Sequence, residues 1–121
     1  MKVLFKTESF SFEVALNDSL TAREIFDSLP IKSVVSTWGD EIYFDIGFKA
    51  SAQGSTMEVI YGDVAYWPQG KCLCIFFGPT PASTGPVPVP ASPVVIVGKT
   101  TASSQELRKI KLGEKISIEK I

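Results

Sequence analysis

Residues 62–81 have the sequence GDVAYWPQGKCLCIFFGPTP, and this stretch decides the fold. One apolar segment ends at Trp67 and a second occupies residues 72–77, with Pro68-Gln69-Gly70-Lys71 as the connection. Successive side chains of a strand point to opposite faces, and both faces are apolar here: Leu73, Ile75 and Phe77 on one, Cys72, Cys74 and Phe76 on the other. This pattern is typical of a central strand covered on both sides. We therefore predict strands at 57–67 and 72–77 that form the spine of a small β-barrel.

The flanking sequence adds further short strands. Alternating apolar and polar residues, or short apolar runs bounded by glycine and proline, predict strands at 2–7, 9–16, 31–38, 41–48, 94–98 and 114–121. The total is about eight strands separated by turn residues. We expect residues 1–121 to form one mainly β domain, a closed or nearly closed and mostly antiparallel barrel.

Two short helices are also predicted. The sequence Thr21-Ala-Arg-Glu24 matches a capping box, in which the threonine side chain and the glutamate side chain bond reciprocally to backbone N–H groups. An apolar helical stripe follows, and Pro30 ends this helix. Ser103 or Ser104 is expected to begin a second helix that continues to Ile110. The first helix should plug one end of the barrel.

Composition excludes several classes of function. The net charge is −1 and the chain has no histidine, which argues against nucleic-acid or anionic-membrane partners and against histidine-based catalysis or zinc binding. No apolar run is long enough for a signal peptide or a membrane span. Cys72 and Cys74 are interpreted as free structural thiols of a reducing compartment. We predict a cytoplasmic protein with no cofactor and no metal site.

Residues 79–93 contain six of the eight prolines. Proline cannot donate to a sheet ladder, so this segment is predicted to be a loop or polyproline II. A loop of this length inside a compact domain is often functional. An interpretation of Pro86-Val-Pro-Val-Pro90 as a ligand for a partner's aromatic groove is less favoured than a rigid surface loop.

The order of these elements and four stretches of sequence resemble the cyclophilins, which are eight-stranded barrels capped by helices. Within that fold, the chain is most similar to small prokaryotic cyclophilin-like proteins of uncharacterised function, over nearly its whole length. The stretches that carry the resemblance are SVVSTWGDEIYF at 33–44, GDVAYWPQGK at 62–71, LCIFFGPTP at 73–81 and PASPVVIVGK at 90–99.

Cyclophilins are prolyl isomerases, so the resemblance implies a pocket for proline and a catalytic arginine. Ile46 or Gly47 stands where that arginine belongs, and Ser92 or Pro93 stands where the family has a pocket histidine. The arginine donates a hydrogen bond to the prolyl nitrogen as the amide twists, and the loss of one such preorganised donor costs roughly 10²–10³ in rate. We therefore expect weak isomerase activity or none.

Other parts of the implied pocket are present. The pocket phenylalanine corresponds to Phe76, and Gln53 is a candidate for the pocket glutamine. Lys49 is a candidate replacement for the arginine, although its ammonium lacks the guanidinium fork. Tyr66 and Trp67 are sequence neighbours, so one should face the barrel interior and the other should face outwards, where it is the better site candidate.

Aromatic residues on the predicted strands define a candidate groove for an apolar or proline-containing ligand, next to the start of the 79–93 loop. A purely structural role in the core is the alternative interpretation of the aromatic side chains. The complete set of ligand-binding candidates is Phe44, Phe48, Gln53, Tyr66, Trp67, Phe76, Pro79 and Thr80.

Glu41 and Asp45 share a strand face and lie near Asp40 in sequence. They could pair for acid–base work or, with Glu58 and Asp63, hold a metal ion through carboxylates alone. A solvated strand face is the favoured interpretation.

The leading functional hypothesis is a binding module for a small molecule or an extended, proline-containing peptide. A divergent prolyl isomerase without the usual arginine is one alternative. A self-associating interaction protein is another, in which an aromatic surface or the Pro-rich loop joins copies of the chain. The catalytic residues, if there are any, are not identified by the sequence.

Overall fold

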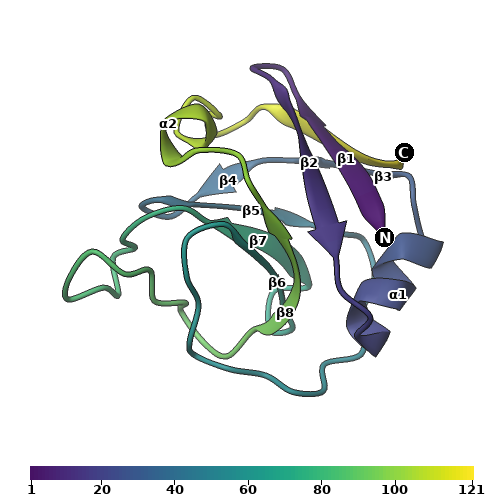
Figure 1. Ribbon diagram of the computed structural model, residues 1–121, viewed down its shortest axis with the longest axis horizontal. Helices are drawn as coiled ribbons and strands as arrows, with labels where there is room; N and C mark the ends of the chain where they lie inside the picture. The colour runs from purple at the N-terminus through teal and green to yellow at the C-terminus, as the bar shows by residue number, and fades with distance from the viewer.

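The computed structural model describes residues 1–121 as nine strands and two short helices (Figure 1). All strand pairs are antiparallel, and the order in the sheet is β3-β9-β1-β2-β8-β6-β7-β5-β4. The elements are β1 Lys2–Thr7, β2 Ser11–Leu16, α1 Leu20–Asp27, β3 Ile31–Val34, β4 Ser36–Thr37, β5 Glu41–Asp45, β6 Asp63–Trp67, β7 Cys72–Phe76, β8 Val95–Thr100, α2 Ser104–Leu107 and β9 Lys115–Lys120.

The sheet curls until its two ends meet, because β3 at one end also lies against β5 near the other end. The prediction of a nearly closed, mainly β barrel is confirmed. The extra strand arises because the predicted strand 31–38 is broken at Val35. There the backbone N–H donates to the Glu114 carbonyl at 2.8 Å, and the side chain is buried in the core.

β7 is buried along its whole length, as a central strand should be. Leu73 and Ile75 belong to the core inside the barrel. Cys74 and Phe76 point to the outer face, where they pack in a second cluster with Val59, Ala65 and Val94. The two-sided burial predicted for this strand is therefore confirmed, and the outer face of the barrel is covered here.

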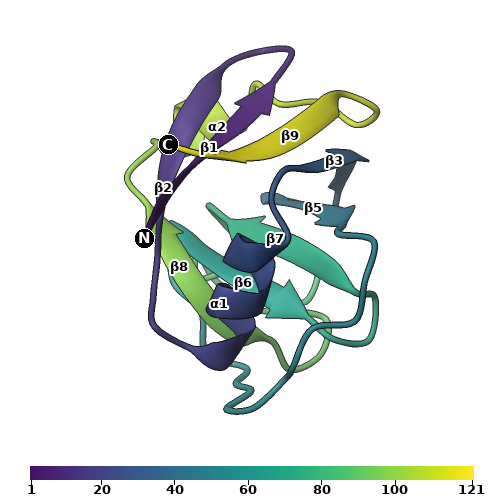
Figure 2. The same cartoon turned by 90° about the vertical axis from the view of Figure 1, so that its right-hand side faces the viewer.

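Helix α1 covers one end of the barrel, on the right in Figure 1 and towards the viewer in Figure 2. Its Ala22 and Ile25 side chains are buried in the barrel core. The predicted capping box at Thr21 is wrong, since the N-cap is Ser19, whose hydroxyl accepts from the Ala22 N–H at 3.1 Å.

The side chains of Thr21 and Glu24 bond to Ser51 instead. The Thr21 hydroxyl donates to the Ser51 carbonyl, and the Glu24 carboxylate accepts from the Ser51 N–H at 2.8 Å and its hydroxyl at 2.6 Å. Residues that match a local capping motif thus fasten the helix to the 49–56 loop. The hydroxyl and N–H bonds of Ser51 lower the pKa of Glu24.

Three other predicted elements differ from the observed ones by three residues or more at one end. The predicted strand 57–67 is reduced to β6, because the chain turns at Gly62, where φ is +89° and an added Cβ would lie 2.7 Å from the Thr100 carbonyl oxygen. β5 ends at Asp45, whose carboxylate accepts from the Gly47 N–H at 2.6 Å. Helix α2 begins after a Ser103 cap as predicted, but it ends at Leu107 instead of Ile110. No helix is long and apolar enough to cross a membrane.

Candidate functional site

A pocket lies on the outer face of β5, β6 and β7, under the last residues of the 79–93 loop. It has a volume of about 170 Å³. We call it the outer pocket and define it by its lining residues, which are Trp38, Glu41, Tyr43, Trp67, Cys74, Phe76, Pro90, Ala91 and Val94.

Strand register brings the strand residues of the outer pocket together. Tyr43 on β5 is opposite Cys74 on β7, and Glu41 is opposite Phe76. These four residues share the outer face of the barrel because side chains alternate along each strand. Trp38 joins them through a tight turn in which its backbone N–H donates to the Glu41 backbone carbonyl at 2.9 Å.

Trp67 connects the sheet to the loop. Its indole N–H donates to the Ser92 hydroxyl at 2.5 Å, and Ser92 in turn donates to the Gln69 side-chain oxygen at 3.0 Å. The Trp67 ring is edge-on to the Tyr43 ring, with centroids 6.3 Å apart and planes at 84°. Two walls of the outer pocket are therefore nearly perpendicular aromatic rings, one of them held in place by the loop.

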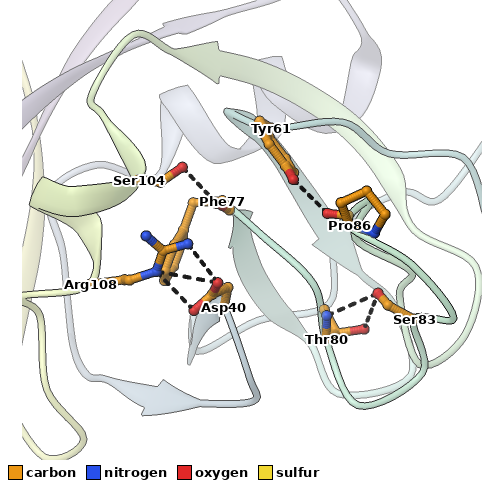
Figure 3. Close-up of polar contacts among 8 residues, drawn as sticks. All are labelled: Asp40, Tyr61, Phe77, Thr80, Ser83, Pro86, Ser104 and Arg108. Atoms are coloured by element: carbon orange, nitrogen blue, oxygen red, sulfur yellow. Dashed lines mark hydrogen bonds and ion pairs between the residues drawn. The ribbon is translucent and has the colours of Figure 1, made fainter.

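Polar contacts seen in Figure 3 fasten the middle of the loop and the segments that flank its beginning. Tyr61 donates to the Pro86 carbonyl at 2.5 Å, and Ser104 donates to the Phe77 carbonyl at 2.7 Å. Arg108 pairs with Asp40 at 2.9 Å.

Inside the loop, the Thr80 N–H donates to the Ser83 hydroxyl at 2.9 Å, as Figure 3 also shows, and Ser83 donates to the Val87 carbonyl at 2.7 Å. Side-chain bonds thus replace the sheet ladder that the prolines cannot join. They hold the loop as a fixed wall beside the sheet.

Glu41 is the single carboxylate of the outer pocket. Its residue is 6% exposed, and the Cys74 thiol is its neighbour on β7. Burial raises the pKa of Glu41 to about 7, and the neighbouring Cys74 thiol opposes that shift only in part. Burial together with the nearby Glu41 raises the pKa of Cys74 well above its usual value, so this thiol stays protonated at neutral pH. The favoured interpretation of Glu41 as part of a solvated strand face is therefore wrong, and Asp45 alone is exposed.

Two of the predicted ligand-binding residues, Trp67 and Phe76, line the outer pocket. Trp67 is the outward-facing member of its pair, whereas Tyr66 is buried inside the barrel and its hydroxyl accepts from the Ala50 N–H at 3.0 Å. Phe44 is in the same core, in edge contact with Phe5.

The other candidates also lie away from the outer pocket. Phe48 packs against the barrel core, and Gln53 is exposed on the 49–56 loop. Pro79 is exposed, and its carbonyl accepts from the Asp40 N–H at 3.0 Å. Thr80 is buried within the loop and donates to the Val89 carbonyl at 2.5 Å. The loop therefore contributes Pro90 and Ala91, near its end, to the outer pocket in place of residues near its beginning.

No arginine or lysine lines the outer pocket. Ile46, at one position assigned to the cyclophilin arginine, is buried in the core, and Gly47 is in a turn with φ of +86°. Arg108 is engaged with Asp40, and Lys49 is exposed on the loop that follows β5. The outer pocket therefore has no counterpart of the cyclophilin arginine among its lining residues.

Sequence reasoning missed Trp38, Tyr43 and Cys74 as site residues, and it considered Glu41 only for acid–base chemistry or metal binding. Alternation along the strands could have identified three of these residues. It places Glu41 and Tyr43 on the same face of β5, and it places Cys74 on the same face of β7 as Phe76. No local signal placed the loop over this face.

The architecture and the outer pocket define a cyclophilin-like β-barrel with an aromatic site on its outer face. The chain belongs to the cyclophilin-like family, whose model matches residues 1–119, and the resemblance predicted from sequence is confirmed. No curated protein matches the chain.

Two solved structures are similar to it. A hypothetical protein from Archaeoglobus fulgidus, known from its solution structure, is 38% identical with a TM-score of 0.84, and the match covers 100% of this chain and 95% of that chain. McbB in complex with tryptophan has a TM-score of 0.72 at 14% identity, over 98% of this chain and 44% of McbB. This chain therefore spans less than half the length of McbB, and that likeness concerns the fold alone.

Proposed function

We propose that this cyclophilin-like protein is a binding module that holds a small ring-bearing molecule in the outer pocket, with little or no prolyl isomerase activity. The observation that carries the proposal is the grouping of four aromatic side chains and one carboxylate around a single cavity of about 170 Å³. Ligand sites are typically concave and apolar, with a few polar groups that orient the ligand.

The size of the cavity limits the ligand. An apolar protein cavity of about 150 Å³ is large enough to bind benzene. The outer pocket therefore suits one ring, either from a free small molecule or from one residue of an extended peptide, such as a proline.

The alternative of a divergent isomerase has less support. The lining of the outer pocket contains no arginine or lysine, whereas the cyclophilin mechanism uses an arginine as the donor to the prolyl nitrogen. The Trp67 indole N–H is already bonded to Ser92. A pocket of this kind can bind a proline ring without lowering the barrier of about 18–20 kcal/mol that amide resonance sets.

Exchange NMR on a panel of X-Pro peptides, together with amide shifts of the labelled protein against small ring compounds, tests the proposal. We expect unchanged cis/trans exchange, and amide shifts confined to Trp38, to β5, β6 and β7, and to residues 90–94. Faster exchange would favour the isomerase instead.

A matched pair of variants locates the site. Ala91 and Ala82 are both exposed residues of the loop, but only Ala91 lines the outer pocket. Ala91→Leu should fill the mouth and weaken ring binding about tenfold or more, since a rigid packed site tolerates added methylenes poorly. Ala82→Leu should leave binding unchanged. Absence of ring binding, or binding that survives Ala91→Leu, would contradict the proposal.

A further inference from the structure

Glu41 is a buried acid without a cationic partner. None of the four ion pairs of the chain includes it, and its residue is 6% exposed. The Cys74 thiol is a weak donor and brings no positive charge. Buried carboxylates in proteins are normally paired or bound to a cation, because an isolated charge is costly to remove from water. The chain itself therefore provides no positive charge to pair with this carboxylate.

The rings around Glu41 have the matching electrostatic character. The face of an aromatic ring is negative, and tryptophan binds cations best. Four aromatic residues line the outer pocket, namely Trp38, Tyr43, Trp67 and Phe76. The planes of the Tyr43 and Trp67 rings meet at 84°, so these two rings form a corner. Aromatic corners of this kind recognise alkylated ammonium groups in other proteins.

The positive charge must come from outside the chain, because the lining includes no lysine or arginine. The Ser92 hydroxyl accepts the indole N–H of Trp67 at 2.5 Å, so that edge of the ring is occupied by the loop. The cavity volume of about 170 Å³ matches a small organic group and is too small for a folded partner's surface to enter.

We propose that the ligand of the outer pocket is a small organic ammonium compound, whose charged nitrogen lies against the Glu41 carboxylate and whose apolar part lies on the aromatic rings. This inference rests on the proposed function, since it names the chemical class of the ligand of the same site. The source to which we commit is a free amine, not an alkylated lysine side chain of a partner protein.

Benzylammonium and benzyl alcohol are the probes, because they share the ring and differ in charge. Titrations followed by amide shifts and tryptophan fluorescence should show that benzylammonium binds about tenfold or more tightly, since hydrogen bonds to charged groups are the stronger class. Glu41→Gln should remove this preference while leaving the ring contacts. Asp45→Asn is the matched control, because Asp45 is an exposed acid on the same face of β5, and it should retain the preference.

The same two probes can be titrated into the unaltered protein at several pH values. This measurement does not depend on whether the Glu41→Gln variant folds. Burial raises the pKa of Glu41 to about 7, whereas an alkylammonium stays protonated well above that pH. The preference for benzylammonium should therefore fall about tenfold from pH 8 to pH 6, as Glu41 gains a proton. The other ionisable side chains near Glu41 are Cys74 and Cys72 on β7 and Tyr43 and Asp45 on β5.

The outcomes separate the two proposals. Equal affinity for both probes would overturn the ammonium inference and leave the ring-binding function standing. A preference for benzylammonium that survives Glu41→Gln, or that is independent of pH, would have the same consequence. Binding of neither probe would overturn both. Binding of a trimethyl-lysine peptide together with failure of benzylammonium would overturn the free amine as the source.

Discussion

Glu41 on β5 and Cys74 on β7 lie diagonally across two paired strands, and both line the outer pocket. Both side chains are on the outer face of the barrel, where the loop before Val94 removes them from water. Because the thiol is a weak donor, it compensates little of the cost of burying the carboxylate. The pair therefore defines both the electrostatics of the outer pocket and a pH-dependent contribution to stability.

Glu41→Gln should become more stable relative to the unaltered protein as pH rises. The folded-state pKa of Glu41 is raised to about 7 from 4.5, chiefly by burial, so the folded state holds its proton more tightly than the unfolded state. Stability from this group is present below about pH 4.5 and is lost as pH rises through 7. Urea unfolding should measure the free energy of unfolding of Glu41→Gln and of the unaltered protein. The difference between them should move by about 3 kcal/mol in favour of the variant from pH 4.5 to pH 8. A pH-independent difference would mean that Glu41 is not desolvated, and Asp45→Asn serves as the control.

Glu24→Gln should loosen the 49–56 loop from helix α1. The carboxylate accepts two hydrogen bonds from Ser51, which lower its pKa below 4.5. Its stabilising effect should therefore be complete above pH 4.5 and disappear as pH falls through the lowered pKa. Hydrogen exchange at the Ser51 amide should become faster in the variant at pH 7. Asp27→Asn, at the exposed end of the same helix, should leave that amide protected, and equal exchange in both variants would refute the tether.

Ser92→Ala should free one wall of the outer pocket. The substitution removes the acceptor of the Trp67 indole N–H, and the loss of such a bond costs about 1 kcal/mol. NMR should show faster solvent exchange of the indole proton and weaker ring binding. Thr84→Ala, which removes an exposed hydroxyl from the same loop, is the control. An unchanged indole exchange rate in Ser92→Ala would show that Ser92 does not hold the ring.

Gly98→Ala should strain the closure of the barrel. A Cβ at this position would lie 2.6 Å from the Ala15 carbonyl oxygen on the neighbouring strand β2, so β8 would have to move away from its partner. We expect a loss of about 1–3 kcal/mol in urea unfolding, which is the usual range for overpacking. Gly85→Ala, where an added Cβ meets nothing within 4 Å, should have little effect. Similar losses in both variants would contradict this account.

Most strands could be predicted from alternation because that signal is local: residues i and i+2 share a face whatever the strand pairs with. The same rule correctly separated Tyr66 from Trp67 and the two faces of β7. Strand lengths were less accurate. Gly62 and Val35 end or break strands because of contacts with Thr100 and Glu114, which are distant in sequence.

The errors at Thr21 and Glu41 have one cause. Each side chain is locally compatible with two environments, and a distant segment selects between them. Thr21 and Glu24 could cap a helix or reach Ser51, and closure of the 49–56 loop brings Ser51 within reach. Glu41 could face water or a pocket, and the loop before Val94 excludes the water.

The sequence by itself determined which residues share a strand face, the two-sided burial of β7 and the proline loop, because these properties follow from local geometry and residue chemistry. The resemblance to cyclophilins, also carried by the sequence, implied that their catalytic arginine has no counterpart here. Only the tertiary structure decided that this loop covers the outer face, and so brought Trp38, Glu41 and Pro90 to one cavity. The physical reason is that desolvation depends on what packs over a side chain, and the covering residues here lie about fifty positions further along the chain than Glu41.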